Sequence, residues 1–472
     1  MDTKKLRQKI LDLAIHGKLV PQDPNDEPAS VLLERIKAEK EDLIKEGKIK
    51  RSKKSAKTSD TPHYENVPFE IPRSWVWATV NDISKSILYG VSESAKSEGK
   101  YKLLRITDIQ DNQVDWGTVP FTDFDEDKVS SYILHDGDIV FARTGATVGK
   151  SYLIKRLRQN AIYASYLIRV QTFDLILPEY VKLFFESGYY WEQIELGSVG
   201  IGQPNVNGTI LGNLNIPLPS FAEQKRIVLK IERWFSLIDQ IEQSKADLQT
   251  TIKQTKSKIL DLAIHGKLVP QDPNDEPSIE LLKRIHPDFT PCDNGHSEKL
   301  PKNWTWAKGI NIFLPMKSTK PKDEEFQYID IDSIDNKRQI INGIKTLKTS
   351  KAPSRASRYT QKNDVIFSMV RPYLRNIAKV INDNCIASTG FYVCSPTPKL
   401  LNSDYCYYLM ISEYVVNGLN QFMKGDNSPS ISKGHIDEWL FPLPPFAEQQ
   451  RIVQKIEVLF SVLDNIQNAL EV

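Results

Sequence analysis

One stretch of this chain occurs twice without a single change, and it constrains the fold more than any other feature. The segment KILDLAIHGKLVPQDPNDEP runs from Lys9 to Pro28 and again from Lys258 to Pro277. Two further pairs are nearly as alike: PLPSFAEQKRIVLKIERWFSLIDQI from Pro217 with PLPPFAEQQRIVQKIEVLFSVLDNI from Pro442, and IPRSWVWA from Ile71 with LPKNWTWA from Leu300. Repeats of this length predict a chain built from two copies of one structural unit.

The repeats follow a circular order. In the middle of the chain the FAEQ segment runs directly into the KILDLAIHGKL segment, between Phe221 and Leu268. At the ends of the chain the same unit is divided, because its second half opens the protein and its first half closes it. Joining the C-terminus to the N-terminus would rebuild the central unit. This order predicts a pseudo-two-fold molecule with neighbouring termini.

The central unit is predicted to form one long helix. Ser220 and Glu223 make a capping box, and neither Gly nor Pro occurs again until Gly266, which suits the position just past a helix end. Apolar residues between them recur at alternating steps of four and three, which is typical of a coiled-coil seam. The seam consists of Ile227, Ile231, Trp234, Ile238, Ile241, Leu248, Ile252, Ile259 and Leu262 in the central unit, and of Ile452, Ile456, Leu459, Leu463, Ile466, Leu470, Leu6, Ile10 and Leu13 in the terminal segments.

Two such helices, one continuous and one divided between the termini, are expected to pack side by side and antiparallel. At ~1.5 Å per residue, the stretch from Ile227 to Leu262 is roughly 50 Å long, or about one and a half turns of B-DNA. The paired helices are therefore expected to act as a ruler. Pro445 stands where the first copy has the Ser220 cap, so that helix must begin differently.

A chain of 472 residues is too long for one core, since a domain usually holds about 150 residues. We expect a mixed α/β protein with two globular domains separated by the long helices. The expected boundaries are 1–28 for the N-terminal half of the helix repeat, 29–65 for a helix and basic linker, 66–219 for the first domain, 220–285 for the central helix, 286–444 for the second domain and 445–472 for the C-terminal half of the helix repeat.

The two globular regions share a frame but differ in most surface-type residues. Each opens with a Trp-x-Trp pair (Trp75 and Trp77, Trp304 and Trp306), for which core packing is the favoured interpretation. Later landmarks also correspond: LLRITDIQD from Leu103 with YIDIDSIDN from Tyr328, and DIVFAR from Asp138 with DVIFSM from Asp364. Near-identical helices suit two equivalent partner subunits, whereas divergent domains suit two different ligands.

Composition excludes some classes of protein. No apolar run approaches the ~20 residues that a membrane span needs, and the N-terminus lacks a secretory signal. The cysteines (Cys292, Cys385, Cys394 and Cys406) form no CxxC pair and are expected to be reduced structural thiols in the cytoplasm. A net charge of +2 is modest for a self-sufficient DNA-binding protein. If the chain grips DNA, either its charges are segregated or partners supply phosphate contacts.

No catalytic motif is recognisable, so the chain is expected to have no activity, cofactor or metal of its own. The stretch from Thr144 to Ser151 resembles a P-loop, but Thr144 replaces the first Gly and a strand-like segment follows. A methyltransferase would need a Gly-rich turn and an Asn/Asp-Pro-Pro-aromatic motif, and neither is present. The histidines show no metal-ligand spacing, and His16 and His265 are expected to satisfy carbonyls at a helix C-terminus.

Candidate DNA contacts are residues that can meet phosphates or base edges. In the first domain these are Lys100, Lys102, Arg105, Arg143 and Lys150, with Gln203, Asn205 and Asn207 in the polar loop GIGQPNVNG. In the second domain they are Arg371, Arg375, Lys424 and Lys433, with Ser428, Ser430 and Ser432 in the loop GDNSPSISKG. For each residue a solvated loop is the competing interpretation. The basic run from Lys45 to Lys57 is either a DNA-facing arm or a linker.

The FAEQKRIVLKIE and FAEQQRIVQKIE segments, the LAIHGKLV pair, the LPxxWxWA openings and DVIFSMVRP resemble type I restriction-modification specificity subunits. The resemblance covers nearly the whole chain in the family's circular order. It implies two target-recognition domains that each read one half of a bipartite, asymmetric DNA site, and helices that fix the unread spacer. It also implies two methyltransferase subunits, which use S-adenosylmethionine, and restriction and translocase subunits, which use ATP and Mg. Two alternatives remain open at this point: a P-loop enzyme and a coiled-coil adaptor that binds only proteins.

Overall fold

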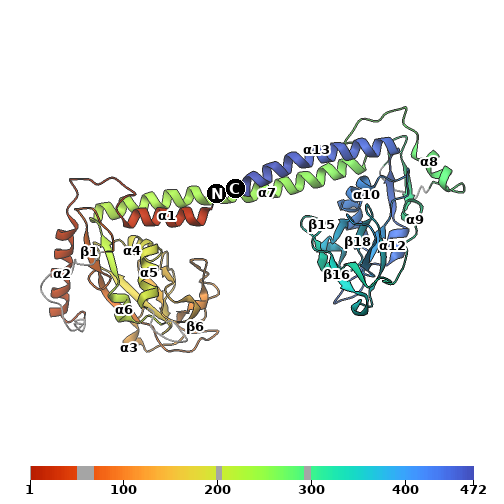
Figure 1. Cartoon of the computed structure of the whole chain (residues 1–472). Coiled ribbons are helices and arrows are strands. Elements are labelled where there is room, and N and C mark those ends of the chain that lie inside the picture. The colour runs from red at the N-terminus through yellow and green to blue at the C-terminus, as the bar shows by residue number, and fades with distance from the viewer. Residues whose placement is uncertain (1, 50–67, 198–204, 292–298, 472) are drawn as a thin grey trace. The chain divides into compact units, whose positions relative to one another are not determined.

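The computed structural model describes residues 2–49, 68–197, 205–291 and 299–471. The chain divides into two compact units, Asp2–Gln243 and Ser244–Val472, which we call the first and the second unit. The long helix α7 (Phe221–Ile264) gives its first part to the first unit and its last part to the second. In each unit a pair of helices carries an α/β domain on one side (Figure 1).

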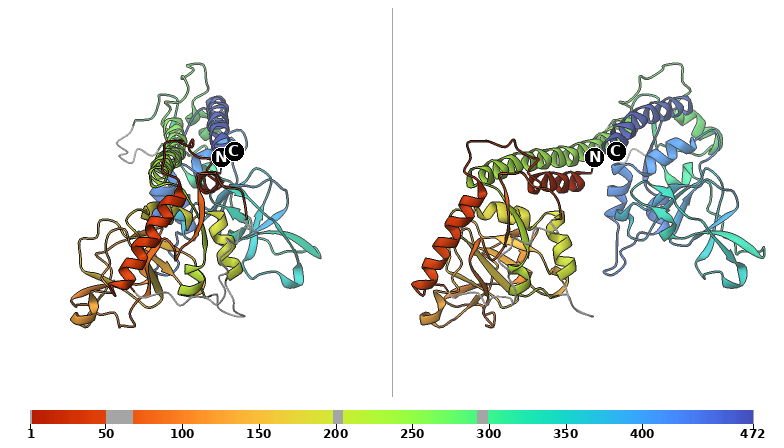
Figure 2. Two further views of the ribbon diagram at one scale, coloured as in Figure 1. Left: turned by 90° about the vertical axis from the view of Figure 1, so that its left-hand side faces the viewer. Right: turned by 60° about the vertical axis from the view of Figure 1, so that its left-hand side comes forward.

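The helical pair of the first unit consists of α1 (Thr3–Ile15) and the first part of α7. Both views of Figure 2 show α1 lying along α7. Ile10 shares one buried cluster with Ile227 and Ile231 of α7. Arg7 pairs with Asp239 at an Nη2–Oδ1 distance of 2.5 Å. Residues of rising number in α1 thus meet residues of falling number in α7, so the pair is antiparallel.

The helical pair of the second unit is built in the same way from α13 (Phe446–Glu471) and the last part of α7. Ile259 of α7 shares a buried cluster with Ile452 and Ile456 of α13. Further along the pair, Lys256 of α7 forms an ion pair with Asp464 of α13. This pairing is also antiparallel, because the α7 residue of higher number meets the α13 residues of lower number.

Part of the predicted seam is more exposed than a closed coiled coil allows. Trp234, Ile241, Leu248 and Ile466 are 41%, 45%, 39% and 41% exposed. An α-helix with 3.6 residues per turn drifts by about 20° per heptad against a 3.5-residue seam, so a straight helix turns some seam positions away from its partner. The seam is therefore buried mainly near the domains, at Ile227, Ile231, Ile252 and Ile456 among others.

Short strands form the frame of the first domain. β1 (Val76–Thr79) pairs with β11 (Asn215–Leu218), and β4 (Ile109–Gln110) pairs with β5 (Gln113–Val114). One sheet has the order β2 (Ser84–Tyr89), β10 (Leu167–Thr172), β7 (Ile139–Ala142), β8 (Ser151–Leu153), and another has the order β6 (Phe121–Thr122), β3 (Tyr101–Leu104), β9 (Ala161–Tyr163). The helices are α2 (Ala29–Lys45), α3 (Glu126–Val129), α4 (Pro178–Phe184), α5 (Gly188–Gly197) and α6 (Gly208–Gly212).

The second domain has the same frame with different sheets. β12 (Thr305–Lys308) pairs with β22 (Leu440–Leu443), and β14 (Ile334–Asp335) pairs with β15 (Ile340–Ile341). One sheet has the order β16 (Lys345–Lys348), β13 (Glu325–Ile329), β20 (Cys385–Ser388), β17 (Ala356–Thr360), and another has the order β19 (Ile377–Lys379), β18 (Val365–Ser368), β21 (Phe391–Cys394). The helices are α8 (Ser278–Ile285), α9 (Gly309–Ile312), α10 (Ser403–Met410), α11 (Glu413–Asn420) and α12 (Lys433–Asp437).

The strand that opens each domain pairs with the strand that leaves it, and the register is the same in both domains. Trp77 lies opposite Pro217 in the first domain, and Trp306 lies opposite Pro442 in the second. A buried tyrosine fixes each of these prolines, since Tyr180 donates to the Pro217 carbonyl at 2.6 Å and its counterpart on α10 donates to the Pro442 carbonyl. The mixed α/β prediction is confirmed.

Candidate nucleic-acid interface

Each domain is tied to its helices by a buried glutamate of the FAEQ segment. In the first unit the Glu223 carboxylate accepts from Trp75 Nε1 at 2.9 Å and from Gln22 Nε2 at 2.5 Å. In the second unit the Glu448 carboxylate accepts from Trp304 Nε1 at 3.0 Å and from the Nε2 of Gln271 at 2.7 Å. Burial is the main influence on both carboxyls, and it raises the pKa of each above its ordinary value.

An ion pair completes each of these junctions, which we call the first and second joint. Arg226 Nη2 lies 2.6 Å from Asp26 in the first joint, and Arg451 Nη2 lies 2.5 Å from Asp275 in the second. The pairing lowers the pKa of Asp26, because the Arg226 guanidinium donates to its carboxylate. All six polar contacts come from repeated sequence, so the two joints are nearly the same structure.

The glutamine that follows the glutamate in FAEQ anchors the domain itself. Gln224 Oε1 accepts from the backbone N–H of Leu177, at the start of α4, at 2.8 Å. Gln449 Oε1 accepts from the backbone N–H of Asn402, at the start of α10, at 2.7 Å. The sequence singled out FAEQ as a repeat, and the structure gives both of its polar residues a partner in the globular domain.

The structure brings together the two segments of the first domain that sequence reasoning proposed for DNA contact. One is the turn between β7 and β8, which begins at Arg143, and the other is the polar loop that contains Asn205. Thr144 pairs with Asn205 as an isolated β-bridge, and the Val206 N–H donates to the Arg143 carbonyl at 2.9 Å. Gln203 lies outside the described residues, as does the basic run from position 50 onward.

The second domain pairs the equivalent segments in the same way. Val370, in the turn between β18 and β19, forms a β-bridge with Ser430 of the polar loop. The Ile431 N–H donates to the Met369 carbonyl at 2.9 Å, which repeats the bond between the segments of the first domain. Lys424 and Ser430 also form a bridge, which closes the polar loop on itself. Each domain thus presents a turn and a polar loop that are joined by a β-bridge and a backbone hydrogen bond.

One predicted DNA contact is wrong. Lys102 is only 6% exposed, and its ammonium group donates to the carbonyl of Val119 at 2.6 Å and lies over the Phe121 ring. A lysine held inside the β3 sheet by a carbonyl acceptor cannot reach a phosphate. The burial of Lys102 could not be predicted from the sequence, because a lysine inside a short strand usually points to solvent.

Several other predicted contacts already have partners inside the domain. In the first domain, Lys100 pairs with Glu126, Arg105 donates through Nε and Nη2 to Asp108, and Asn207 Oδ1 caps α6 by accepting from the N–H of Ile210. In the second domain, Arg375 donates to the Ile411 carbonyl at 2.6 Å and to Glu413, and Lys433 pairs with the buried Asp437. Lys150, Asn205, Arg371, Lys424 and Ser428 are exposed, and Ser430 is half-buried.

Arg143 has surroundings that its sequence did not predict. Its guanidinium stacks over the Tyr89 ring at 4.8 Å from the ring centroid, and its Nε is buried with no hydrogen-bond partner among the described residues. The Arg143 N–H donates to the carbonyl of Tyr166, whose side chain is 63% exposed. The sequence did not identify Tyr89 and Tyr166 as neighbours of Arg143, because a tyrosine at the end of a strand carries no sequence signal of its own.

The stretch from Thr144 to Ser151 does not form a P-loop, because the predicted strand follows it. Gly145–Thr147 forms a single 3-10 turn and the strand β8 follows it, so no long helix presents its N-terminus to a phosphate. Within the described ranges no group of three or more His, Cys, Asp or Glu side chains is placed to hold a metal ion. His16 and His265 each bond through Nδ1 to the backbone carbonyl four residues earlier, as expected at a helix end.

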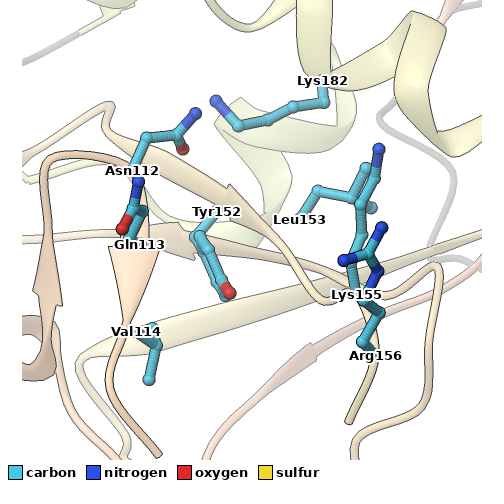
Figure 3. A pocket seen from close by; sticks show the side chains of 8 residues that line it. All are labelled: Asn112, Gln113, Val114, Tyr152, Leu153, Lys155, Arg156 and Lys182. Atoms are coloured by element: carbon cyan, nitrogen blue, oxygen red, sulfur yellow. The ribbon is translucent and has the colours of Figure 1, made fainter.

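A cavity of about 460 Å³ lies beside the β4–β5 hairpin of the first domain. Figure 3 shows Lys182 approaching it from α4, with Tyr152 between the hairpin and the basic side chains. Its cations are largely compensated, since Lys182 pairs with Glu186 and Lys155 lies 3.4 Å from Glu179. We therefore assign no ligand to this cavity.

Two α/β domains of one frame, held by matching joints on helical repeats and differing in their exposed turns, define a duplicated two-domain protein. The chain belongs to the family described as the type I restriction modification DNA specificity domain, whose profile matches residues 72–250 and 311–472. Across the part of the chain that the structure describes, no helix has the length and apolar character needed to cross a membrane.

Similar proteins agree with this assignment. The chain is 27% identical to the type I restriction enzyme EcoAI specificity subunit of Escherichia coli, over 98% of this chain and 90% of the relative. It is 26% identical to the EcoEI specificity subunit of Escherichia coli, over 99% of this chain and 91% of the relative. The predicted resemblance to specificity subunits is confirmed.

Solved structures show the same fold. The HsdS subunit from Thermoanaerobacter tengcongensis matches with a TM-score of 0.52 and 16% identity, over 86% of this chain and 92% of that chain. A chain from a structure on complex assembly and conformational transition of the type I R-M system matches with a TM-score of 0.60 and 17% identity, over 86% of this chain and 94% of that chain.

Proposed function

We propose that this chain is the DNA-recognition subunit of a type I restriction-modification complex that reads a bipartite, asymmetric site. The domain of residues 66–219 reads one half-site, and the domain of residues 286–444 reads the other. The observation that carries this proposal is the contrast between matching joints and differing turns. One frame with two chemically different exposed faces suits two different base sequences.

The repeated segments are proposed to dock two copies of one methyltransferase subunit. In the copies Lys9–Pro28 and Lys258–Pro277 the exposed residues are identical as well as the buried ones, and the two copies fold alike. The Asn25 N–H donates to Asp23 Oδ1 at 2.9 Å, and the Asn274 N–H donates to Asp272 Oδ1 at the same distance. Packing does not require identity at exposed positions, so a shared partner surface is the physical reason to keep it.

The partner subunits supply the chemistry in this proposal. The methyltransferase subunits bring S-adenosylmethionine and methylate adenine, and restriction and translocase subunits bring ATP- and Mg-dependent translocation and cleavage in the cytoplasm. This chain contributes recognition and a scaffold. Because α7 runs from one unit into the other without a break, its length is proposed to set the unread spacer between the half-sites.

Mapping of methylated adenines tests the proposal directly. The chain is co-expressed with its methyltransferase subunit, and modified sites are mapped across the host genome. The expected result is one bipartite motif, and replacement of residues 286–444 by the equivalent domain of another specificity subunit should change one half of it. Methylation without any bipartite motif, or a change in both halves, would contradict the proposal and favour a protein-only adaptor.

A further inference from the structure

The turn between β7 and β8 and the turn between β18 and β19 occupy the same place in the frame. The strands that lead into them, β7 and β18, are buried along their whole length. Both turns then pair with the polar loop of their own domain through the same backbone bond. What the two turns present to solvent is different.

The backbone of both turns visits the left-handed region twice. In the first domain glycines take these positions, with φ of +76° at Gly145 and +86° at Gly149. In the second domain arginines take them, with φ of +48° at Arg371 and +58° at Arg375. Non-glycine residues in this conformation carry a steric cost. The second turn is therefore held in a conformation that its sequence does not favour.

Arg375 has a structural reason to be there. A Cβ at Gly149 would lie 2.5 Å from the Trp191 ring of α5, so the first domain requires glycine. The equivalent residue of α11 is the smaller Val416, which leaves room for a side chain. The Arg375 guanidinium then ties the turn to the end of α10 through the carbonyl of Ile411 and to α11 through the carboxylate of Glu413.

Arg371 anchors the other side of the turn, and its exposed guanidinium can donate further hydrogen bonds to a ligand. Its backbone N–H donates to the Pro429 carbonyl at 2.8 Å, and its Nη2 donates to the Asn427 carbonyl at 2.8 Å. The residue is otherwise exposed. The two arginines thus clamp both ends of a short turn, Pro372–Leu374, whose proline is buried.

The clamped turn presents two apolar side chains to solvent. Tyr373 is 46% exposed and Leu374 is 40% exposed. Apolar side chains on a rigid turn, beside a guanidinium and a loop of small polar residues, fit a groove of double-stranded DNA. Thymine offers a methyl group there, and base edges offer acceptors to arginine.

We propose that the Pro372–Leu374 turn enters the major groove and sets part of the half-site of the second domain. Tyr373 and Leu374 pack against thymine methyl groups, and Arg371 donates to a neighbouring base edge. This inference rests on the proposed function, because it assumes that the second domain reads DNA. The turn of the first domain, with glycines in place of the arginines, reads its half-site by other contacts.

A double variant tests the role of the two apolar side chains. Tyr373→Ala with Leu374→Ala is co-expressed with the methyltransferase subunit, and methylated adenines are mapped as for the wild type. The preference at one or two positions of one half-site should fall roughly tenfold, the usual effect of a lost base contact, while the other half-site is unchanged. Retention of the wild-type preference at every position would overturn the inference.

Ile381→Ala is the matched control, since Ile381 is 62% exposed just past the opposite end of β19. It should leave both half-sites unchanged. If the wild-type complex itself yields no bipartite motif, the proposed function fails. If the wild type yields the motif and the double variant keeps it, only the present inference fails.

A second measurement needs no variant that might misfold. Uracil replaces each thymine of the methylated motif in turn, which removes only the methyl group, and binding of the wild-type complex is measured. Loss of a buried methyl-sized group should weaken binding about fourfold. Equal affinity for thymine and uracil DNA would overturn the proposed methyl contacts.

Discussion

The two joints form one repeated part of the molecule, and the turns β7–β8 and β18–β19 form another. The two copies agree closely in the joints and less closely in the turns. The joints repeat contact for contact, with Glu223 and Glu448 each accepting from a tryptophan and a glutamine. The turns keep their strands and their bond to the polar loop, but exchange Gly145 for Arg371. The joints that hold the domains are alike in the two units, whereas the exposed turns β7–β8 and β18–β19 differ.

The difference separates a function that both units share, which is to hold a domain, from one that each domain has for itself, which is to contact its own ligand. A joint that varied would change how a domain is carried, so both units need the same solution. A turn that varied would change only what its own domain contacts.

Gly149→Ala should destabilise the first unit strongly. The new Cβ would lie 2.5 Å from the Trp191 ring, on a backbone with φ of +86°. Strain and overpacking together should cost about 3 kcal/mol of unfolding free energy, measured by denaturant unfolding. Gly145→Ala is the control, since among the described residues no atom beyond its chain neighbours lies within 4 Å of the added Cβ, and it should cost about 1 kcal/mol. Equal losses in both variants would refute the account of the Trp191 contact.

Removing the joint carboxylate should have the same effect in both units. Glu223→Ala and Glu448→Ala each leave a buried tryptophan N–H without its acceptor. The expected loss is about 2 kcal/mol of unfolding free energy in each case, followed by denaturant unfolding of the full chain. Losses that differ by more than a factor of two would show that the joints are not equivalent.

The ion pairs of the joints should contribute less. Arg226 and Arg451 are 34% and 35% exposed at their side chains, so solvent screens part of their attraction to Asp26 and Asp275. Arg226→Ala and Arg451→Ala should each cost about 1 kcal/mol of unfolding free energy. Thermal unfolding in low and high salt checks this, since the cost should shrink as salt rises.

The smallest effect concerns pH. The pKa of Glu448 is raised by burial, so the folded chain holds its proton more tightly than the unfolded chain. This carboxyl therefore stabilises the fold most below its unfolded pKa of about 4.5, and the contribution is lost as pH rises through the higher folded pKa. Glu448→Gln places an NH2 group against one of the two donors, Trp304 or Gln271, at the same cost at every pH, so its stability relative to wild type should fall from pH 7 toward pH 4. A difference in stability that is constant with pH would contradict the burial effect.

Much of the fold could be predicted from the sequence, because long repeats and helical periodicity are local signals. The long helix, the antiparallel pairs and the mixed α/β domains follow from them. Individual contacts could not be predicted, because they depend on tertiary neighbours. Lys102 and Arg375 are residue types that often contact DNA. In the structure Lys102 donates to the carbonyl of Val119, and Arg375 donates to a carbonyl at the end of α10. Tyr373 and Leu374 were missed because exposure is not visible in a sequence.

Replacing the first domain by a second copy of the second domain tests whether the two domains read DNA independently. Residues 72–219 are replaced by a second copy of residues 301–444, joined at the matching prolines, and the complex with the methyltransferase subunit is used to map methylated adenines. If matching joints carry two independent readers, the methylated site becomes a palindrome built from one wild-type half-site. An asymmetric wild-type motif, retained by a folded and active complex, would contradict the account.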